Sequence, residues 1–101
     1  MVNDTQVLNN GYPMPSIGLG VYKITDEDME NVVNTAIETG YWAFDTAYFY
    51  GNEVALGKAL QNSGVDREDL FITSKLWNDY QGYDNTIEYF NQSLENLGLD
   101  Y

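Results

Sequence analysis

The sequence contains no cysteine and no histidine, and it has few positive charges. The lack of cysteine excludes disulfide bonds and thiolate metal sites, and the lack of histidine excludes imidazole ligands and histidine-based acid–base pairs. Lys and Arg together number 4 against 16 Asp and Glu, so the formal net charge is −12 at pH 7. Because nucleic acids and anionic membranes are bound by clustered cations, this charge argues against both as partners.

Long hydrophobic runs are also missing. No stretch approaches the roughly 18 apolar residues of a membrane-spanning helix. Residues Met1–Thr5 have neither the basic nor the apolar part of a signal peptide. We therefore expect a soluble protein with a cytoplasmic location. The chain has 101 residues, 44% of them hydrophobic, which is the size and composition of one domain with a modest core.

The residues that are present alternate between short apolar stretches and helical segments. The turn residues Asn9-Asn10-Gly11 predict a hairpin over residues 6–15. Strands are predicted at residues 17–21, 41–44 and 70–74. Three helices, each ending at a glycine, are predicted after the cap residue Thr25, near Asn52 and after the cap residue Asp84. This order predicts a single α/β domain over residues 1–101, with parallel strands alternating with helices.

Polar side chains follow two of the predicted strands. Asp45 ends the second strand, Tyr50 lies in the next loop and Lys75 follows the third strand. The carboxyl ends of parallel strands carry the functional residues of such folds. We expect Lys75 to point into a partly desolvated site and to pair with Asp45, the carboxylate at the matching height. An ammonium group near a phenol favours the phenolate, so Tyr50 is a candidate proton donor to a carbonyl oxygen.

Spacing alone leaves alternatives open. A solvated lysine, a strand-end aspartate and a tyrosine that packs a turn are common in loops and explain the same pattern. Spacing also does not decide whether Tyr48 or Tyr50 points inward.

Longer motifs narrow the interpretation. Residues 17–20 read IGLG, residues 45–53 read DTAYFYGNE, residues 63–78 read SGVDREDLFITSKLWN, and residues 97–101 read LGLDY. Together, and in this order, they resemble the aldo-keto reductase family over essentially the whole chain. The resemblance implies a (β/α)8 TIM barrel, of which this chain carries the N-terminal hairpin and about three of the eight βα units. It also implies an oxidoreductase that reduces aldehydes or ketones to alcohols.

The resemblance assigns roles to particular residues. Asp45, Tyr50 and Lys75 match three catalytic residues of the family. In that family the Tyr donates the proton, the Lys tunes the Tyr, the Asp holds the Lys in place and the nicotinamide delivers hydride. The family's catalytic histidine belongs to the end of a fourth strand, beyond Tyr101. The implied cofactor is NADPH, with NADH as the alternative, and the implied partner is a small-molecule carbonyl substrate.

Further positions carry over from the same resemblance. Gly20, Val21 and Asp45 match the positions that lie against the cofactor. Tyr22 and Trp77 match residues of the substrate pocket, although the family often has Trp at the position of Tyr22. The alternative interpretation of Trp77 is a core or rim aromatic residue.

Asn52 and Glu53 are interpreted as residues that start a helix. Asparagine is a preferred helix cap, and a glutamate in the first turn interacts favourably with the helix dipole.

The scarcity of cations bears on the cofactor. A pyrophosphate and a ribose phosphate are held by Arg or Lys clamps or by helix N-termini, whereas the cations here are Lys23, Lys58, Arg67 and Lys75. We therefore expect most of the phosphate contacts to lie in the rest of the barrel and the 101 residues alone to be inactive. The alternative is a truncated, non-catalytic β/α module that acts in binding or assembly.

The sheet of such a partial barrel has open edges. We expect Leu19, Val21, Phe44 and Ile72 to face the barrel interior without an opposite layer. The isolated chain is then expected to be a marginal monomer or to self-associate through these edges.

Overall fold

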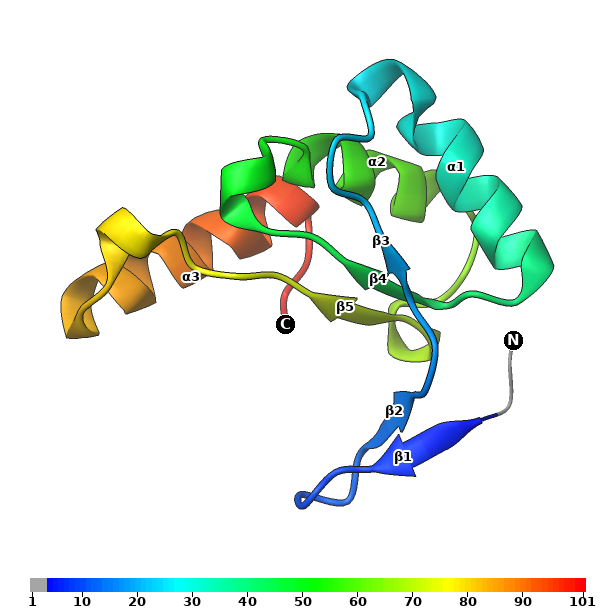
Figure 1. Ribbon diagram of the computed structural model, residues 1–101, viewed down its shortest axis with the longest axis horizontal. Helices are drawn as coiled ribbons and strands as arrows, with labels where there is room; N and C mark the ends of the chain where they lie inside the picture. The colour runs from blue at the N-terminus through cyan, green and yellow to red at the C-terminus, as the bar shows by residue number, and fades with distance from the viewer. Residues whose placement is uncertain (1–3) are drawn as a thin grey trace.

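The computed structural model describes residues 4–101. Residues Met1–Asn3 lie outside the described residues. They belong to the segment Met1–Thr5, for which we expect no signal peptide. A small hairpin projects from a layer of parallel strands, and helices cover one face of these strands (Figure 1). No helix within residues 4–101 has the length and apolar character needed to cross a membrane.

The elements follow the predicted order. The strands are β1 (Thr5–Val7), β2 (Pro13–Pro15), β3 (Leu19–Gly20), β4 (Ala43–Asp45) and β5 (Phe71–Thr73). The α-helices are α1 (Asp26–Thr39), α2 (Glu53–Asn62) and α3 (Tyr83–Leu97). Short 3-10 turns are η1 (Tyr48–Tyr50), η2 (Arg67–Asp69) and η3 (Asn78–Tyr80). The strands are shorter than the sequence predicts.

The predicted hairpin is present. Strands β1 and β2 pair antiparallel, with Thr5 opposite Pro15 and Val7 opposite Pro13. Gly11 has a φ of 87°, a conformation that glycine adopts without strain, and the Asn10 side chain accepts a hydrogen bond from the Tyr12 N–H at 3.1 Å. The local turn residues therefore determine this element.

Strands β3, β4 and β5 form a parallel sheet in that order, so β3 and β5 are its edges. One row across the sheet consists of Leu19, Phe44 and Ile72. The next row consists of Gly20, Asp45 and Thr73. Side chains of successive residues point to opposite faces of a sheet, so the two rows lie on opposite faces.

The hydrophobic row corrects one expectation. Phe44 and Val21 are fully buried in the core between sheet and helices, and Leu19 and Ile72 pack against that core. All four residues therefore lie on the helix side and not on the barrel-interior side. The reason is the register, which puts the apolar row under the helices and Asp45 on the other face.

Helix α1 shows the predicted end signals. The Thr25 side chain accepts a hydrogen bond from the Asp28 N–H at 3.3 Å. Gly40, with a φ of 105°, ends the helix and donates its N–H to the carbonyl of Ala36. The capping threonine and the left-handed glycine thus set both ends.

Helix α3 begins at Tyr83, one residue before the predicted cap, Asp84. The cap position is Gly82, whose carbonyl accepts a hydrogen bond from the Thr86 N–H at 2.8 Å. Gly82 has a φ of 123° and turns the chain from η3 into the helix, so Asp84 lies within the first helical turn.

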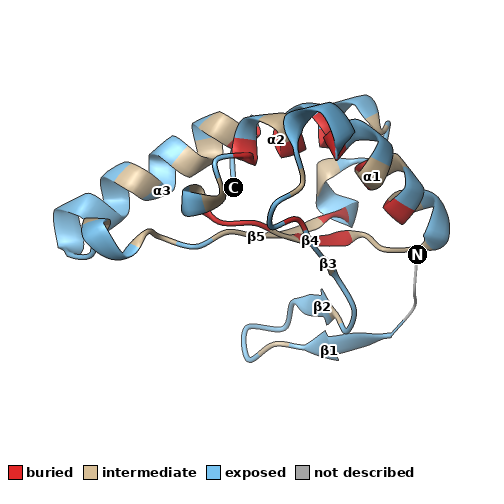
Figure 2. Ribbon diagram, turned by 45° about the horizontal axis from the view of Figure 1, so that its top comes forward, coloured by how far each residue is buried: buried red, intermediate tan, exposed pale blue. Residues whose placement is uncertain are grey.

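The buried residues gather where α1 and α2 cover the sheet (Figure 2). The largest fully buried side chains are Val21, Met29, Val33, Phe44, Thr46 and Leu56. Helices α2 and α3 meet closely at Gly57, where an added Cβ would lie 2.3 Å from the Leu97 carbonyl oxygen. This contact is possible because glycine has no side chain.

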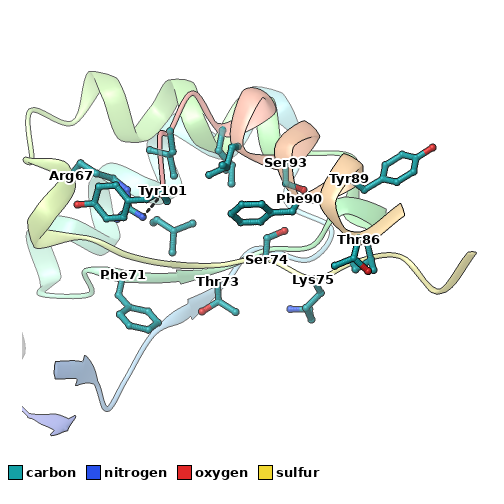
Figure 3. A pocket seen from close by; sticks show the side chains of 15 residues that line it. Arg67, Phe71, Thr73, Ser74, Lys75, Thr86, Tyr89, Phe90, Ser93 and Tyr101 are labelled. Atoms are coloured by element: carbon teal, nitrogen blue, oxygen red, sulfur yellow. Dashed lines mark hydrogen bonds between the residues drawn. The ribbon is translucent and has the colours of Figure 1, made fainter. Parts of the chain in front are cut away.

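An open cleft separates α3 from β5 (Figure 3). Its volume is about 480 Å³, and apolar side chains such as Ile72, Phe90 and Leu94 line much of it. Phe90, near the middle of α3, is 58% exposed, because no further layer within residues 4–101 packs against it.

Candidate active site

The candidate site lies at the carboxyl ends of β4 and β5. The pairing of these strands continues into their loops, because the Thr46 N–H donates to the Thr73 carbonyl at 2.8 Å and the Tyr48 N–H to the Lys75 carbonyl at 3.1 Å. The two loops therefore run side by side. This arrangement brings Lys75 next to Asp45, and the Lys75 Nζ donates a hydrogen bond to the Asp45 Oδ1.

The lysine and the aspartate form a solvent-accessible ion pair. The Lys75 side chain is 47% exposed and the Asp45 side chain 51% exposed, so about half of each side chain remains accessible to solvent. Lys75 projects from the sheet face opposite the helices (Figure 3). Its burial is slight and lowers the pKa of Lys75, but the hydrogen bond and charge of Asp45, with a smaller contribution from Tyr50, raise that pKa above its ordinary value.

Tyr50, and not Tyr48, lies beside the ion pair. The Lys75 Nζ is 5.2 Å from the centre of the Tyr50 ring. Tyr48 instead packs edge-on against the rings of Tyr80 and Tyr89, at centroid distances of 5.6 and 5.5 Å. The geometry therefore resolves the choice that spacing left open.

Tyr22 forms one wall of the same site. Its ring centre is 4.8 Å from that of Tyr50, with the two planes tilted by 41°, and its side chain is 57% exposed. Tyr22 is the second residue after β3, so the ends of all three parallel strands contribute a side chain to this edge of the sheet.

Trp77 belongs to a stacked aromatic pair. Its ring lies 3.9 Å from that of Phe49, with an angle of 9° between the planes. The Trp77 Nε1 donates a hydrogen bond to Asp79 Oδ2 at 3.0 Å, which fixes the orientation of the indole. Sequence reasoning missed Phe49, although its position between Tyr48 and Tyr50 in the same loop was a usable signal.

The three predicted cofactor positions differ in accessibility. Gly20 is exposed, and an added Cβ there would meet no atom within 4 Å. Val21 is fully buried. Its N–H donates to the Asp45 carbonyl at 3.0 Å, and its carbonyl accepts from Asn52 Nδ2 at 2.9 Å. Gly20 and Asp45 therefore offer accessible surface at this edge, whereas the Val21 side chain offers none.

Asn52 does not form the side-chain capping hydrogen bond that we expect of it. It occupies the cap position of α2, but its side chain makes no capping hydrogen bond. The buried amide instead donates to the carbonyls of Val21 (2.9 Å) and Ile24 (3.3 Å) and accepts from the Thr46 hydroxyl (3.0 Å). Asn52 thus ties the loop after β3 to the loop after β4, directly beneath the site.

Glu53 is also more than a helix-start residue. It is 3% exposed, and its two oxygens accept hydrogen bonds from the Ser74 hydroxyl at 2.7 Å and the Asn96 amide at 3.1 Å. These partners are distant in the sequence, so neither composition nor spacing indicates them.

The arrangement of the acidic side chains bears on a possible metal site. Within residues 4–101, no three Asp or Glu side chains come together in a group that could hold a metal ion. The chemistry available at the site is that of a phenol, an ammonium group and a carboxylate.

Known proteins share this sequence and this fold. The profile described as Aldo/keto reductase family matches residues 15–101. Over 101 residues the chain is 48% identical to a glyoxal reductase of Bacillus subtilis, covering 99% of this chain and 37% of that protein. It is 46% identical over 94 residues to a morphine 6-dehydrogenase of Pseudomonas putida, covering 93% and 32%. A crystal structure of an aldo/keto reductase from Brucella melitensis superimposes with a TM-score of 0.93 at 44% identity, over 100% of this chain and 38% of that one.

The chain belongs to the aldo/keto reductase family. Its three parallel strands and their helices form part of a (β/α)8 barrel, which confirms the predicted fold class. The chain spans about a third of the length of the relatives that it matches.

Proposed function

We propose that this chain supplies the Asp, Tyr and Lys of an NADPH-dependent oxidoreductase that reduces small aldehydes or ketones to alcohols in the cytoplasm. The observation that supports it is the contact between the Lys75 ammonium, the Asp45 carboxylate and the Tyr50 ring at the carboxyl edge of the sheet. Family membership supports carbonyl reduction in general terms.

The proposed roles follow from the chemistry of the three groups. Tyr50 donates its phenolic proton to the carbonyl oxygen of the substrate. The Lys75 ammonium stabilises the phenolate that this transfer leaves behind. Asp45 holds Lys75 in place through the hydrogen bond to its Nζ. NADPH, when bound, supplies the hydride.

The residues at this edge fit one part of that cofactor. Gly20 lacks a side chain and has open space above it, so a flat ring can approach the backbone beside Asp45. The phosphates need cations, and Arg67 is already bonded to the carbonyls of Leu70 and Tyr101. We propose that most phosphate contacts come from residues outside this chain, and that NADH is the alternative cofactor because no residue here is assigned to the 2′-phosphate.

The proposed substrate pocket has aromatic walls. Tyr22 lies against Tyr50 on one side, and Trp77 with its stacked partner Phe49 forms another wall. Flat aromatic surfaces accept small apolar or aromatic carbonyl compounds. The name of the glyoxal reductase relative makes a small dicarbonyl a reasonable first test substrate.

The test uses the natural gene product that carries these residues, and it follows NADPH oxidation with a small aldehyde. Tyr50→Phe is expected to lower kcat by about a hundredfold or more, because the proton donor is lost. Tyr48→Phe is the matched control and is expected to keep its activity, since Tyr48 packs against Tyr80 and Tyr89. Equal activity of Tyr50→Phe and the unsubstituted protein would overturn the proposal. The 101 residues alone are expected to show no turnover.

A second candidate is a non-catalytic module that binds another protein or a second copy of itself. The open edges of β3 and β5 and the apolar cleft beside β5 favour it. Tight NADPH binding with turnover by the 101-residue chain would exclude this candidate. Sedimentation of a stable monomer at low and high salt would argue against self-association.

A further inference from the structure

Glu53 is a buried carboxylate to which the proposed chemistry gives no role. It is 3% exposed, and the ion pair found within residues 4–101 joins two other residues, Lys75 and Asp45. A buried carboxylate is strongly unfavourable unless its oxygens are hydrogen-bonded. Both Glu53 oxygens are bonded, to Ser74 and to Asn96, and the N-terminal position in α2 adds a favourable dipole.

The partners of Glu53 connect three elements. Ser74 directly follows β5, Asn96 lies in the last turns of α3, and Glu53 itself begins α2. Ser74 is also the residue next to Lys75. The Glu53 carboxylate therefore fixes the end of β5 against the helix layer.

The hydrogen bond between Ser74 and Glu53 adds a side-chain restraint where β5 ends and its backbone pairing continues only through the loops. The last residue of β5 paired with β4 is Thr73, opposite Asp45. Beyond it, the Tyr48 N–H bonds to the Lys75 carbonyl at 3.1 Å. Ser74 points towards the helices and Lys75 away from them (Figure 3), so a restraint on Ser74 orients the backbone from which the Lys75 side chain projects.

We propose that Glu53 is a positioning residue that acts through Ser74 to keep the Lys75 ammonium at the height of the Asp45 carboxylate. Its relevance to catalysis rests on the proposed function, in which Lys75 tunes Tyr50. The positioning itself is a property of the folded chain and is measured without turnover. A failure of the reductase proposal would therefore leave this test intact.

The experiment follows proton exchange of the lysine ammonium groups by ¹⁵N NMR in the 101-residue chain. Lys23 and Lys58 are internal references, because neither forms an ion pair within the described residues. Lys75, bonded to Asp45, is expected to exchange more slowly than both. Ser74→Ala is expected to speed Lys75 proton exchange by about threefold, because the stabilisation that an exposed ion pair provides corresponds to a factor of this size. The exchange of Lys23 and Lys58 is expected to stay unchanged.

Two further variants separate positioning from general loosening. Asn96→Ala removes the other hydrogen bond to the same Glu53 carboxylate, yet it is expected to leave Lys75 exchange unchanged. Ser74→Thr keeps the hydroxyl and is expected to keep slow exchange. The proposal is overturned if Ser74→Ala leaves Lys75 unaffected, if Asn96→Ala speeds it equally, or if Ser74→Thr behaves like Ser74→Ala. Circular dichroism of each variant reports that the fold is retained.

Discussion

Replacing Asn52 by aspartate tests the polar connection beneath the site. The Asn52 Nδ2 donates to the carbonyls of Val21 and Ile24, and the residue is 4% exposed. Asn52→Asp keeps the size of the side chain but replaces this donor with an acceptor. The hydrogen bond from the Thr46 hydroxyl to the other oxygen is retained.

The expected loss of stability follows from these contacts. Two hydrogen bonds contribute about 1 kcal/mol each, and the half-buried Ile24 carbonyl that loses this donor costs about 1 kcal/mol more, whereas the Val21 carbonyl keeps the Ile24 N–H. We therefore expect Asn52→Asp to lower the free energy of unfolding by about 3 kcal/mol, a large part of the roughly 5–15 kcal/mol typical of a domain.

Urea unfolding followed by circular dichroism measures the difference. A loss of about 3 kcal/mol corresponds to a midpoint shift of about 2 M for a small domain. Asn91→Asp is the matched control, because Asn91 is exposed on α3 and receives the same added charge. A difference between the two variants of less than about 1 kcal/mol would refute the role given to the Asn52 amide.

Three further predictions concern the packing and the charges of the site. Gly57→Ala is expected to destabilise the chain by about 1–2 kcal/mol in urea unfolding, because the added Cβ meets a backbone carbonyl at 2.3 Å and this outweighs the gain in helix propensity. Asp45→Asn is expected to lower the pKa of Lys75 in an NMR titration, because Asp45 raises that pKa. The stabilisation from this ion pair is present at neutral pH and is lost as the pH rises through the folded-state pKa of Lys75. Phe49→Ala is expected to shift the fluorescence of Trp77 to longer wavelength, because the stacked ring at 3.9 Å no longer shields the indole; an unchanged spectrum would contradict the stacking.

Local signals in the sequence account for the elements that were predicted well. The turn at Asn9-Asn10-Gly11, the cap at Thr25 and the end at Gly40 act within a few residues, so the hairpin and α1 follow from the sequence. The Asp45–Lys75 contact was also predictable, because parallel neighbouring strands bring their carboxyl ends to the same edge.

Features that depend on distant partners were not predictable. The strands have only two or three residues each, and this alternation is too short to distinguish the helix face from the opposite face. Phe44 lies on the helix face and not on the predicted one. The hydrogen bonds of Asn52 and Glu53 reach 31 and 43 residues along the chain, and both residues also fit a local helix-start pattern. For Lys75, the exposure depends on what covers its face of the sheet, which composition does not reveal.

The long reach of these side-chain hydrogen bonds has a consequence for the order of folding. Asn52 to Val21 closes a loop of 31 residues, and Glu53 to Asn96 closes one of 43, whereas the hairpin closes within its own turn. The entropy of closing the larger loops is lost before these bonds can form. We expect the polar residues beneath the site to become ordered after the folding transition state. Substitutions at Asn52 and Glu53 are then expected to accelerate unfolding and to leave the folding rate nearly unchanged.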